Sequence, residues 1–390
     1  MRGLKGSISN SRSSNLELAR IIAMLAIIAH HYVVNSGVTD FLYGYDLTGK
    51  GVFLQLWGMW GKTAINVFVL ITGYFMCEKE FKWRRLIRLV LQVEFWKIML
   101  FPVFFIVDVP AADVRRSVLS IAFLPLLNVN NSFTSSFIVF YLFIPALKFI
   151  VDRGGAYLHA GTMALLFASN TVSFSFFSNS FGFTEVSWYA FLFLLAAWLR
   201  RHPPRFISNP KTCFLLFSGC VALSVGGTLF LDAQAGFGVG AYGTGLRYLD
   251  QSGKIMAFLV GLTCFLFFRV LPVKQSPLVN VVASTTFGVL LVHANSAAMR
   301  KFLWRDVLNV PRAFSLPGPL LVLHAVASMI GVFTVSSVLD WLRIRYVEPV
   351  YMGWYDRHAR RLNRLAERMA SKAAAGLSRL DSFLAGVDAG

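Results

Sequence analysis

Charged residues are scarce in this sequence. Asp, Glu, Lys and Arg make up 14% of the 390 residues, whereas 56% are hydrophobic and the mean hydropathy is +0.61. Soluble domains carry about 25% charged residues, so a soluble protein is excluded. Many windows of about 20 apolar residues lie between basic or Gly/Pro-rich breaks, as transmembrane helices require. These runs lack the strict alternation of a transmembrane β-barrel, so we expect an all-α, polytopic membrane protein.

The sequence also contains few cysteines and no clear signal-peptide cleavage site. The four cysteines have no metal-ligand spacing and lie in or beside apolar segments, which indicates packing roles and no metal site. They are Cys77, Cys213, Cys220 and Cys264. The N-terminus places basic residues ahead of an apolar run, as a signal peptide does, but no clear small-x-small cleavage site follows. We therefore expect a retained first span.

Ten transmembrane spans fit the hydropathy pattern. They cover about residues 16–36, 52–76, 86–107, 132–151, 156–176, 185–200, 212–231, 254–271, 279–299 and 318–341. The stretch 117–127 could add a re-entrant or interfacial piece. Lys and Arg concentrate in the segments that face the cytoplasm if the N-terminus lies inside, which predicts an N-in, C-in protein. The same distribution accounts for the net charge of +18 without nucleic acid as a partner.

Three segments follow from this pattern. We expect a cytoplasmic N-terminal segment at 1–14, a membrane domain at 15–345 and a basic, amphipathic cytoplasmic tail at 346–390. The tail would lie on the inner membrane surface, because basic side chains are attracted to anionic lipid headgroups.

The first apolar segment contains ionisable side chains, which are costly in hydrocarbon and often functional. Arg20 and His31 are eleven residues apart, which on an α-helix is three turns plus about 20°, with a rise of about 16.5 Å. They therefore share a face with Glu17, whereas His30 points elsewhere and is expected to pack or to form a neighbouring hydrogen bond. Two interpretations stay open. Either this stripe belongs to an active site, or Arg20 reaches the cytoplasmic surface and His31 makes a structural interhelical hydrogen bond.

A second group of charges opens the predicted third span. Arg85 and Arg88 are three residues apart and share a helix face. Positive-inside topology alone would produce such a cluster. The alternative is a phosphate clamp, because guanidinium groups bind phosphate oxygens in bidentate fashion. Farther along the span, the spacing of Glu94 and Lys97 predicts an i,i+3 ion pair.

In this order, the motifs resemble those of the acyltransferase-3 family of bacterial membrane acyltransferases. The resemblance covers roughly residues 15–345. It rests on Arg-x10-His in the first span (Arg20, His31), a glycine-ended second span, Arg-x2-Arg opening the third (Arg85, Arg88) and the run that ends at His293. Many members have Ser-Gly where this chain has Thr72-Gly73. Some members also carry a secreted hydrolase-like domain, whereas we expect only a helical tail here.

The resemblance implies a ten-span enzyme of the bacterial cytoplasmic (inner) membrane. It would move an acyl group, usually acetyl, from cytosolic acyl-CoA to a hydroxyl of an envelope or extracellular glycan or of a lipid-linked saccharide. Arg85 and Arg88 would dock the coenzyme A phosphates. His31, kept neutral by burial, would act as general base or form an acyl-histidine intermediate. Arg20 would orient His31 indirectly or stabilise developing negative charge. Polysaccharide-assembly proteins are candidate partners.

His293 lies near the outer end of the predicted ninth span, where the family pattern often has a histidine. It could contact the acceptor, or it could be structural, as single histidines at membrane interfaces often are. Two longer outer loops, 232–253 and 300–317, hold aromatic and acidic residues. They could bind a sugar, or they could be surface turns with interfacial anchors.

Two other classes of function compete with the enzyme. A transporter or flippase for a lipid-linked saccharide would use Glu17, Arg20 and His31 as a substrate or proton pathway, and it would depend on a gradient rather than on acyl-CoA. A non-catalytic component of a polysaccharide-assembly system would tolerate changes at Arg20, His31 and Arg85. That component would lose its function when residues 355–390 are removed.

Overall fold

The computed structural model describes residues 13–42, 47–106, 133–176 and 184–359, and within these ranges the chain forms helices and turns without a strand. The longer helices are α1 (Ser14–Val34), α2 (Gly49–Gly58), α3 (Gly61–Met76), α4 (Trp83–Ile106), α6 (Phe133–Arg153), α7 (Gly155–Phe167), α9 (Glu185–Arg201), α10 (Pro210–Gly236), α11 (Ile255–Val270), α12 (Pro277–His293) and α15 (Gly318–Leu342). Between them lie η1 (Thr39–Leu42), η3 (Ala168–Val172), α8 (Ser173–Phe176), η4 (Arg205–Ser208), η5 (Thr244–Tyr248), α13 (Ala297–Lys301), η6 (Phe302–Val307) and α14 (Val310–Ser315), and η7 (Arg343–Val347) follows α15.

Helices occupy the positions of all ten predicted spans, but fewer of them meet the requirements of a membrane crossing. Four described stretches are long and apolar enough: α1, α6, α10 and the stretch Gly318–Ala359 that begins with α15. A fifth would be the pair Pro277–His293 and Ala297–Val307, which is bent by 95°. These helices support an all-α membrane protein. Ten crossings and the N-in, C-in orientation stay predictions, and the predicted pieces at 117–127 and 360–390 lie outside the described residues.

Several helices begin at side chains that cap their free N–H groups. The side chain of Asn209 accepts a hydrogen bond from the backbone of Lys211, and Pro210 fills the first position of α10. Ser276 and Pro277 start α12 in the same way. Capping side chains and an initial proline both favour a helix start, so these boundaries follow from local sequence.

The predicted second span, 52–76, is divided into α2 and α3, which both pack against α1. Two glycines allow this close approach. A Cβ atom at Gly58 would lie 2.8 Å from the side chain of Val33, and one at Gly61 would lie 2.4 Å from Cγ of His30. Any larger residue would push the helices apart.

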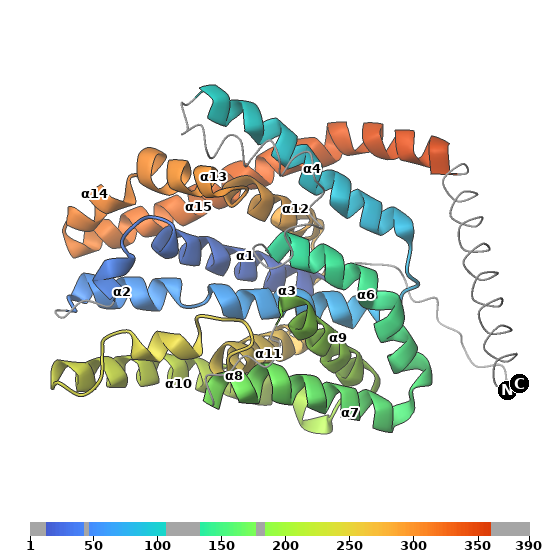
Figure 1. Ribbon diagram of the computed structural model, residues 1–390, viewed down its shortest axis with the longest axis horizontal. Helices are drawn as coiled ribbons and strands as arrows, with labels where there is room; N and C mark the ends of the chain where they lie inside the picture. Colours follow the sequence, from blue (N-terminus) through green and yellow to red (C-terminus); the bar gives the residue numbers. More distant parts are fainter. Residues whose placement is uncertain (1–12, 43–46, 107–132, 177–183, 360–390) are drawn as a thin grey trace, which may run out of the picture. The chain divides into compact units, whose positions relative to one another are not determined.

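Helix α1 is the centre of the packing. It contacts α2, α3, α11 and α12, and Figure 1 shows it running between α12 and α3. Many of its apolar side chains, among them Leu16, Met24 and Ile28, are almost completely buried, whereas Ile22 and Val34 are exposed. Of the ionisable residues of this helix, Glu17 is buried, and Arg20, His30 and His31 are partly buried.

Asn66 connects α3 to α9 and α11. Its Nδ2 donates hydrogen bonds to the carbonyl oxygens of Ser252 (2.9 Å) and Ala257 (3.0 Å), and its Oδ1 accepts one from Nε1 of Trp188 (2.8 Å). Gly261 packs against the Asn66 side chain, where a Cβ would lie 2.8 Å away. The amide is fully used in these contacts, which makes Asn66 a structural residue.

Gly288 of α12 packs directly against Asp340 of α15. A Cβ atom at Gly288 would lie 1.9 Å from Cγ of Asp340. The buried Asp340 carboxylate accepts hydrogen bonds from Nε1 of Trp96 (2.9 Å) and Nε2 of Gln92 (3.4 Å). A buried carboxylate needs such donors, so this contact ties α4, α12 and α15 together.

The two predicted outer loops contain more helix than expected. Helix α10 continues to Gly236 and η5 follows, while α13, η6 and α14 fill most of 300–317. Trp304 is completely buried and lies edge-on to Tyr32, with ring centroids 5.9 Å apart. Trp304 therefore packs in the interior and is not an interfacial anchor of this loop.

The chain divides into two compact units, residues 1–340 and 341–390. In the second unit, the described residues 341–359 are helical. There Arg343 forms an ion pair with Glu348 (3.0 Å) and a hydrogen bond with the Tyr351 hydroxyl (2.6 Å). All the predicted site residues lie in the first unit.

Candidate active site

Three consecutive residues near the C-terminal end of α1 bind three different neighbours. Nδ1 of His30 lies 2.7 Å from the carbonyl oxygen of Gly58 in α2. Nδ1 of His31 lies 3.0 Å from Nε2 of His293 in α12. The hydroxyl of Tyr32 lies 2.9 Å from Nδ1 of His324 in α15. Successive helical residues point about 100° apart, so this end of α1 is fixed from three directions.

The His31–His293 pair brings together two residues that the sequence singled out separately. His293 is completely buried, and His31 is half-buried. Their ring centroids are 5.1 Å apart and the ring planes are tilted by 53°. His31 is therefore the more accessible member, with His293 behind it.

The hydrogen bonds fix the tautomers of this pair in its neutral form. Nδ1 of His293 lies 2.6 Å from the carbonyl oxygen of Val289. A carbonyl only accepts, so this nitrogen carries the hydrogen and Nε2 of His293 carries the lone pair. Nδ1–H of His31 must then donate to that lone pair. It follows that Nε2 of His31 is unprotonated and able to accept a proton.

Arg20 lies on the same face of α1 but far from the histidine pair. Its guanidinium contacts both carboxylate oxygens of the buried Glu17, each at 3.2 Å. The rise along α1 separates the backbone of Arg20 from that of His31 by about 16.5 Å. The structure thus pairs Arg20 with Glu17, and any influence on His31 is indirect.

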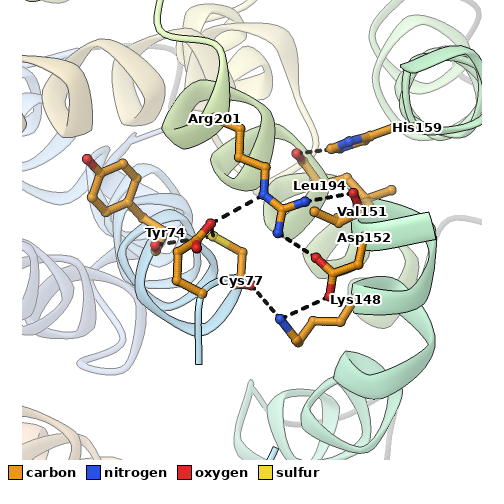
Figure 2. A network of polar contacts seen from close by, with 9 residues as sticks. Tyr74, Cys77, Lys148, Val151, Asp152, His159, Leu194 and Arg201 are labelled. Atoms are coloured by element: carbon orange, nitrogen blue, oxygen red, sulfur yellow. Dashed lines mark hydrogen bonds and ion pairs between the residues drawn. The ribbon is translucent and has the colours of Figure 1, made fainter. Parts of the chain in front are cut away.

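The ends of α3, α6 and α9 are joined by a polar network (Figure 2). Arg201 of α9 binds Asp152, the carbonyl oxygen of Val151 (2.7 Å) and Glu78 (3.3 Å). Lys148 of α6 binds the carbonyl oxygen of Cys77 (2.6 Å) and Asp152 (3.3 Å). These cations are occupied by carboxylates and carbonyls, which indicates a structural role.

The predicted phosphate clamp lies close to this network. Arg85 and Arg88 occupy the first two turns of α4; Arg85 is half-buried and Arg88 is exposed. Nη1 of Arg85 donates to the carbonyl oxygen of Glu80 (3.1 Å) and approaches Sδ of Met76 (3.9 Å). The predicted pair of Glu94 and Lys97 is present at 3.7 Å.

Arg200 is a cation near the clamp that the sequence patterns did not single out. It is half-buried at the end of α9, and its guanidinium carbon lies 4.5 Å above the ring of Tyr74. Within the described ranges, no carboxylate forms an ion pair with Arg200, in contrast to its neighbour Arg201. The stacked geometry leaves N–H groups at the guanidinium edge for an anion. In the sequence, Arg200 and Arg201 are two basic residues at the end of a predicted span, as topology alone would produce.

In the described part of the chain, no group of three or more His, Cys, Asp or Glu side chains is placed to hold a metal ion. The histidine pair is held by protein hydrogen bonds instead.

The apolar helices identify this protein as a multi-pass membrane protein. Its helical bundle holds ionisable residues, among them the His31–His293 pair. The particular family is given by sequence comparison. The chain belongs to the acyltransferase-3 family, whose profile, an acyltransferase domain, matches residues 13–341. No curated protein and no solved structure shows significant similarity to it. The protein is thus a membrane acyltransferase, and the match covers the helices from α1 nearly to the end of α15.

Proposed function

We propose that this protein transfers an acyl group, most simply acetyl, from cytosolic acyl-CoA to a hydroxyl of an envelope or extracellular glycan, with His31 as general base. The observation that carries this proposal is the hydrogen bond from His31 to His293. It leaves Nε2 of His31 as a fixed, half-buried proton acceptor, which is what activation of a hydroxyl requires.

In the proposed reaction, His31 carries the proton from the acceptor hydroxyl to the leaving coenzyme A. Nε2 of His31 accepts the proton of the acceptor hydroxyl while the hydroxyl oxygen attacks the thioester carbonyl carbon. The new C–O bond forms the ester and the C–S bond breaks. The coenzyme A thiolate then takes the proton from His31 and leaves as the thiol. His293 supports this cycle by orienting the His31 ring and by stabilising the transient imidazolium through its lone pair.

The acyl-CoA donor would be held by cations near the start of α4 and the end of α9. Phosphate oxygens bind guanidinium groups strongly. Arg85 and Arg88 supply the first two groups, and Arg200, stacked on Tyr74 without a paired carboxylate among the described residues, supplies a third. The acyl-bearing arm must then reach the C-terminal end of α1, where His31 lies. Arg20 and its partner Glu17 lie about three turns away from His31 on the same face, so Arg20 would act on the passage of the donor rather than on the proton transfer.

The acceptor would be a glycan, a lipid-linked saccharide or a related envelope molecule, and the protein would lie in the bacterial inner membrane. Polysaccharide-assembly proteins fit as partners, because an acceptor in polymer form has to be delivered to the membrane. The two alternative functions, a transporter and a non-catalytic component, would not depend on acyl-CoA. This dependence distinguishes the enzyme from both.

Radiolabelled acetyl transfer from acetyl-CoA to the envelope glycan fraction tests the proposal. We expect membranes that contain the intact protein to label the glycan, and membranes without it to leave the glycan unlabelled. If acetyl-CoA gives no label, succinyl-CoA is tested in the same way, and a second failure would contradict the proposed reaction. Brief exposure to the donor without acceptor distinguishes direct transfer from an acyl-histidine intermediate, because only the latter labels the protein itself.

A further inference from the structure

A cavity of about 220 Å³ lies at the C-terminal end of α1, on the side of the helix away from His293. It is lined by residues of α1, α2 and the η5 region. Apolar walls come from side chains such as Val33, Leu54 and Leu246, and the polar lining consists of His30, Gln55 and Asp250. None of the roles proposed above uses this cavity.

His30 is held firmly in the wall. Its Nδ1 lies 2.7 Å from the carbonyl oxygen of Gly58 and must donate to it. Gly61 packs so closely that a Cβ atom there would lie 2.4 Å from Cγ of His30. The ring is fixed in one orientation, and in its neutral form Nε2 carries a lone pair. His30 therefore offers a hydrogen-bond acceptor.

Gln55 is the second polar group and is almost completely buried, with 1% of its surface exposed. Its Nε2 donates to the carbonyl oxygen of Leu42 at 2.8 Å, and its amide also contacts the buried carboxyl group of Asp232 in α10. Its buried Oε1 accepts no hydrogen bond from any group that the structure describes. Buried polar atoms are normally satisfied, so Oε1 indicates a ligand or water with a donor hydrogen.

The residues that line the cavity indicate the chemical class of its ligand. Nε2 of His30, Oε1 of Gln55 and the Asp250 carboxylate all accept hydrogen bonds, so a ligand must donate. Lys62, Arg247 and Lys254 lie near Asp250 and balance its charge. Hydroxyl groups on a ring with apolar faces meet both the acceptors and the apolar walls. An anion would meet only acceptors among the polar lining residues, because Lys62, Arg247 and Lys254 do not line the cavity. The volume corresponds to about seven water molecules in bulk liquid, which is room for one sugar ring.

We propose that this cavity is a subsite for one neutral sugar unit of the acceptor. The inference rests on the proposed function, because it assumes a glycan acceptor. The rings of His30 and His31 have centroids 5.8 Å apart, but His31 does not line the cavity. The bound unit is thus the neighbour of the acylated one, and it positions that neighbour at Nε2 of His31.

Sugar binding is tested directly, apart from catalysis. Saturation-transfer NMR on the purified full chain in nanodiscs would use methyl glycosides of glucose, galactose and mannose as probes, with glucose 6-phosphate as the charged comparison. We expect a signal from at least one neutral glycoside with the intact protein and with His31→Ala. The signal should fall by about tenfold or more in Leu246→Trp, which fills the cavity.

A second variant covers the case in which Leu246→Trp does not fold. Gln55→Leu removes the buried acceptor and should also weaken the signal, while Gln92→Leu, a buried glutamine in α4 outside the cavity, should keep it. A lack of signal from every neutral glycoside, equal signals in all folded variants, or a stronger signal from glucose 6-phosphate would each overturn the subsite. Because the readout is binding, a failure of acetyl transfer alone would contradict only the proposed function.

Discussion

Nδ1 of His31 lies 3.0 Å from Nε2 of His293, although 262 positions separate the two residues in the chain. The contact joins α1 to α12, and the carbonyl oxygen of Val289 fixes its direction. A histidine whose ring is oriented by a second histidine has one defined basic nitrogen. This arrangement is the basis of the reaction proposed above.

Substitution of His293 tests its positioning role. His293→Leu removes the acceptor for Nδ1–H of His31, so the ring can rotate and change tautomer. We expect kcat to fall by about 100-fold, as small misplacements of a catalytic group do, with KM for acyl-CoA unchanged. His293→Gln keeps an acceptor oxygen and should recover part of kcat. Equal activity of the Leu and Gln variants, at equal folded yield, would contradict this role.

The neighbours Arg200 and Arg201 are predicted to differ in function. Arg200→Ala removes a cation without a paired carboxylate among the described residues, so we expect a raised KM for acyl-CoA and a normal melting temperature. Arg201→Ala breaks the contacts with Glu78 and Asp152 and should lower the melting temperature. That effect should be modest, because partly exposed ion pairs contribute about 0.2–1 kcal/mol each.

Kinetics with acyl-CoA and thermal unfolding in detergent measure the two effects on the same preparations. If Arg200→Ala changes stability and leaves the KM for acyl-CoA unchanged, Arg200 belongs to the structural network and not to the donor site.

The contact between Gly288 and Asp340 predicts a strict requirement for glycine. Gly288→Ala would place a methyl group 1.9 Å from Cγ of Asp340. Overpacking of this kind costs about 1–3 kcal/mol, so the unfolding midpoint should fall or the protein should fail to accumulate. Gly331→Ala in α15 is the matched control, since its Cβ would meet no atom within 4 Å. Similar melting temperatures for both variants would show that α12 and α15 separate easily.

The sequence predicted the helices well because apolar length and capping residues are local signals. It also singled out His31, because ionisable residues stand out within apolar segments, and His293, because the family pattern often has a histidine there. Their hydrogen bond could not be predicted, because it depends on how α1 and α12 pack. The division of 52–76 was missed for the same reason, as Gly58 and Gly61 gain their meaning only from Val33 and His30.

Arg200 and His30 show a further limit of the sequence. A basic residue at the end of a span fits topology alone, and only its stacking on Tyr74 distinguishes Arg200 from Arg201. His30 was expected to pack or to form a neighbouring hydrogen bond, and it does bond the carbonyl oxygen of Gly58; its place in the wall of a cavity beside Gln55 was not predicted. The ion pair of Arg20 with Glu17 agrees with their shared helix face, and the indirect action of Arg20 on His31 stays a prediction.

The role of His31 is tested by comparing His31→Ala with His159→Gln in the acetyl-transfer assay. His159 is a buried histidine of α7 that binds the carbonyl oxygen of Leu194, so its substitution controls for the loss of a buried histidine. At equal amounts of folded protein, we expect His31→Ala to lower kcat by about 10²- to 10⁴-fold, the usual contribution of a general base, and His159→Gln to retain transfer. Full transfer by a folded His31→Ala protein would contradict the central claim that His31 activates the acceptor hydroxyl.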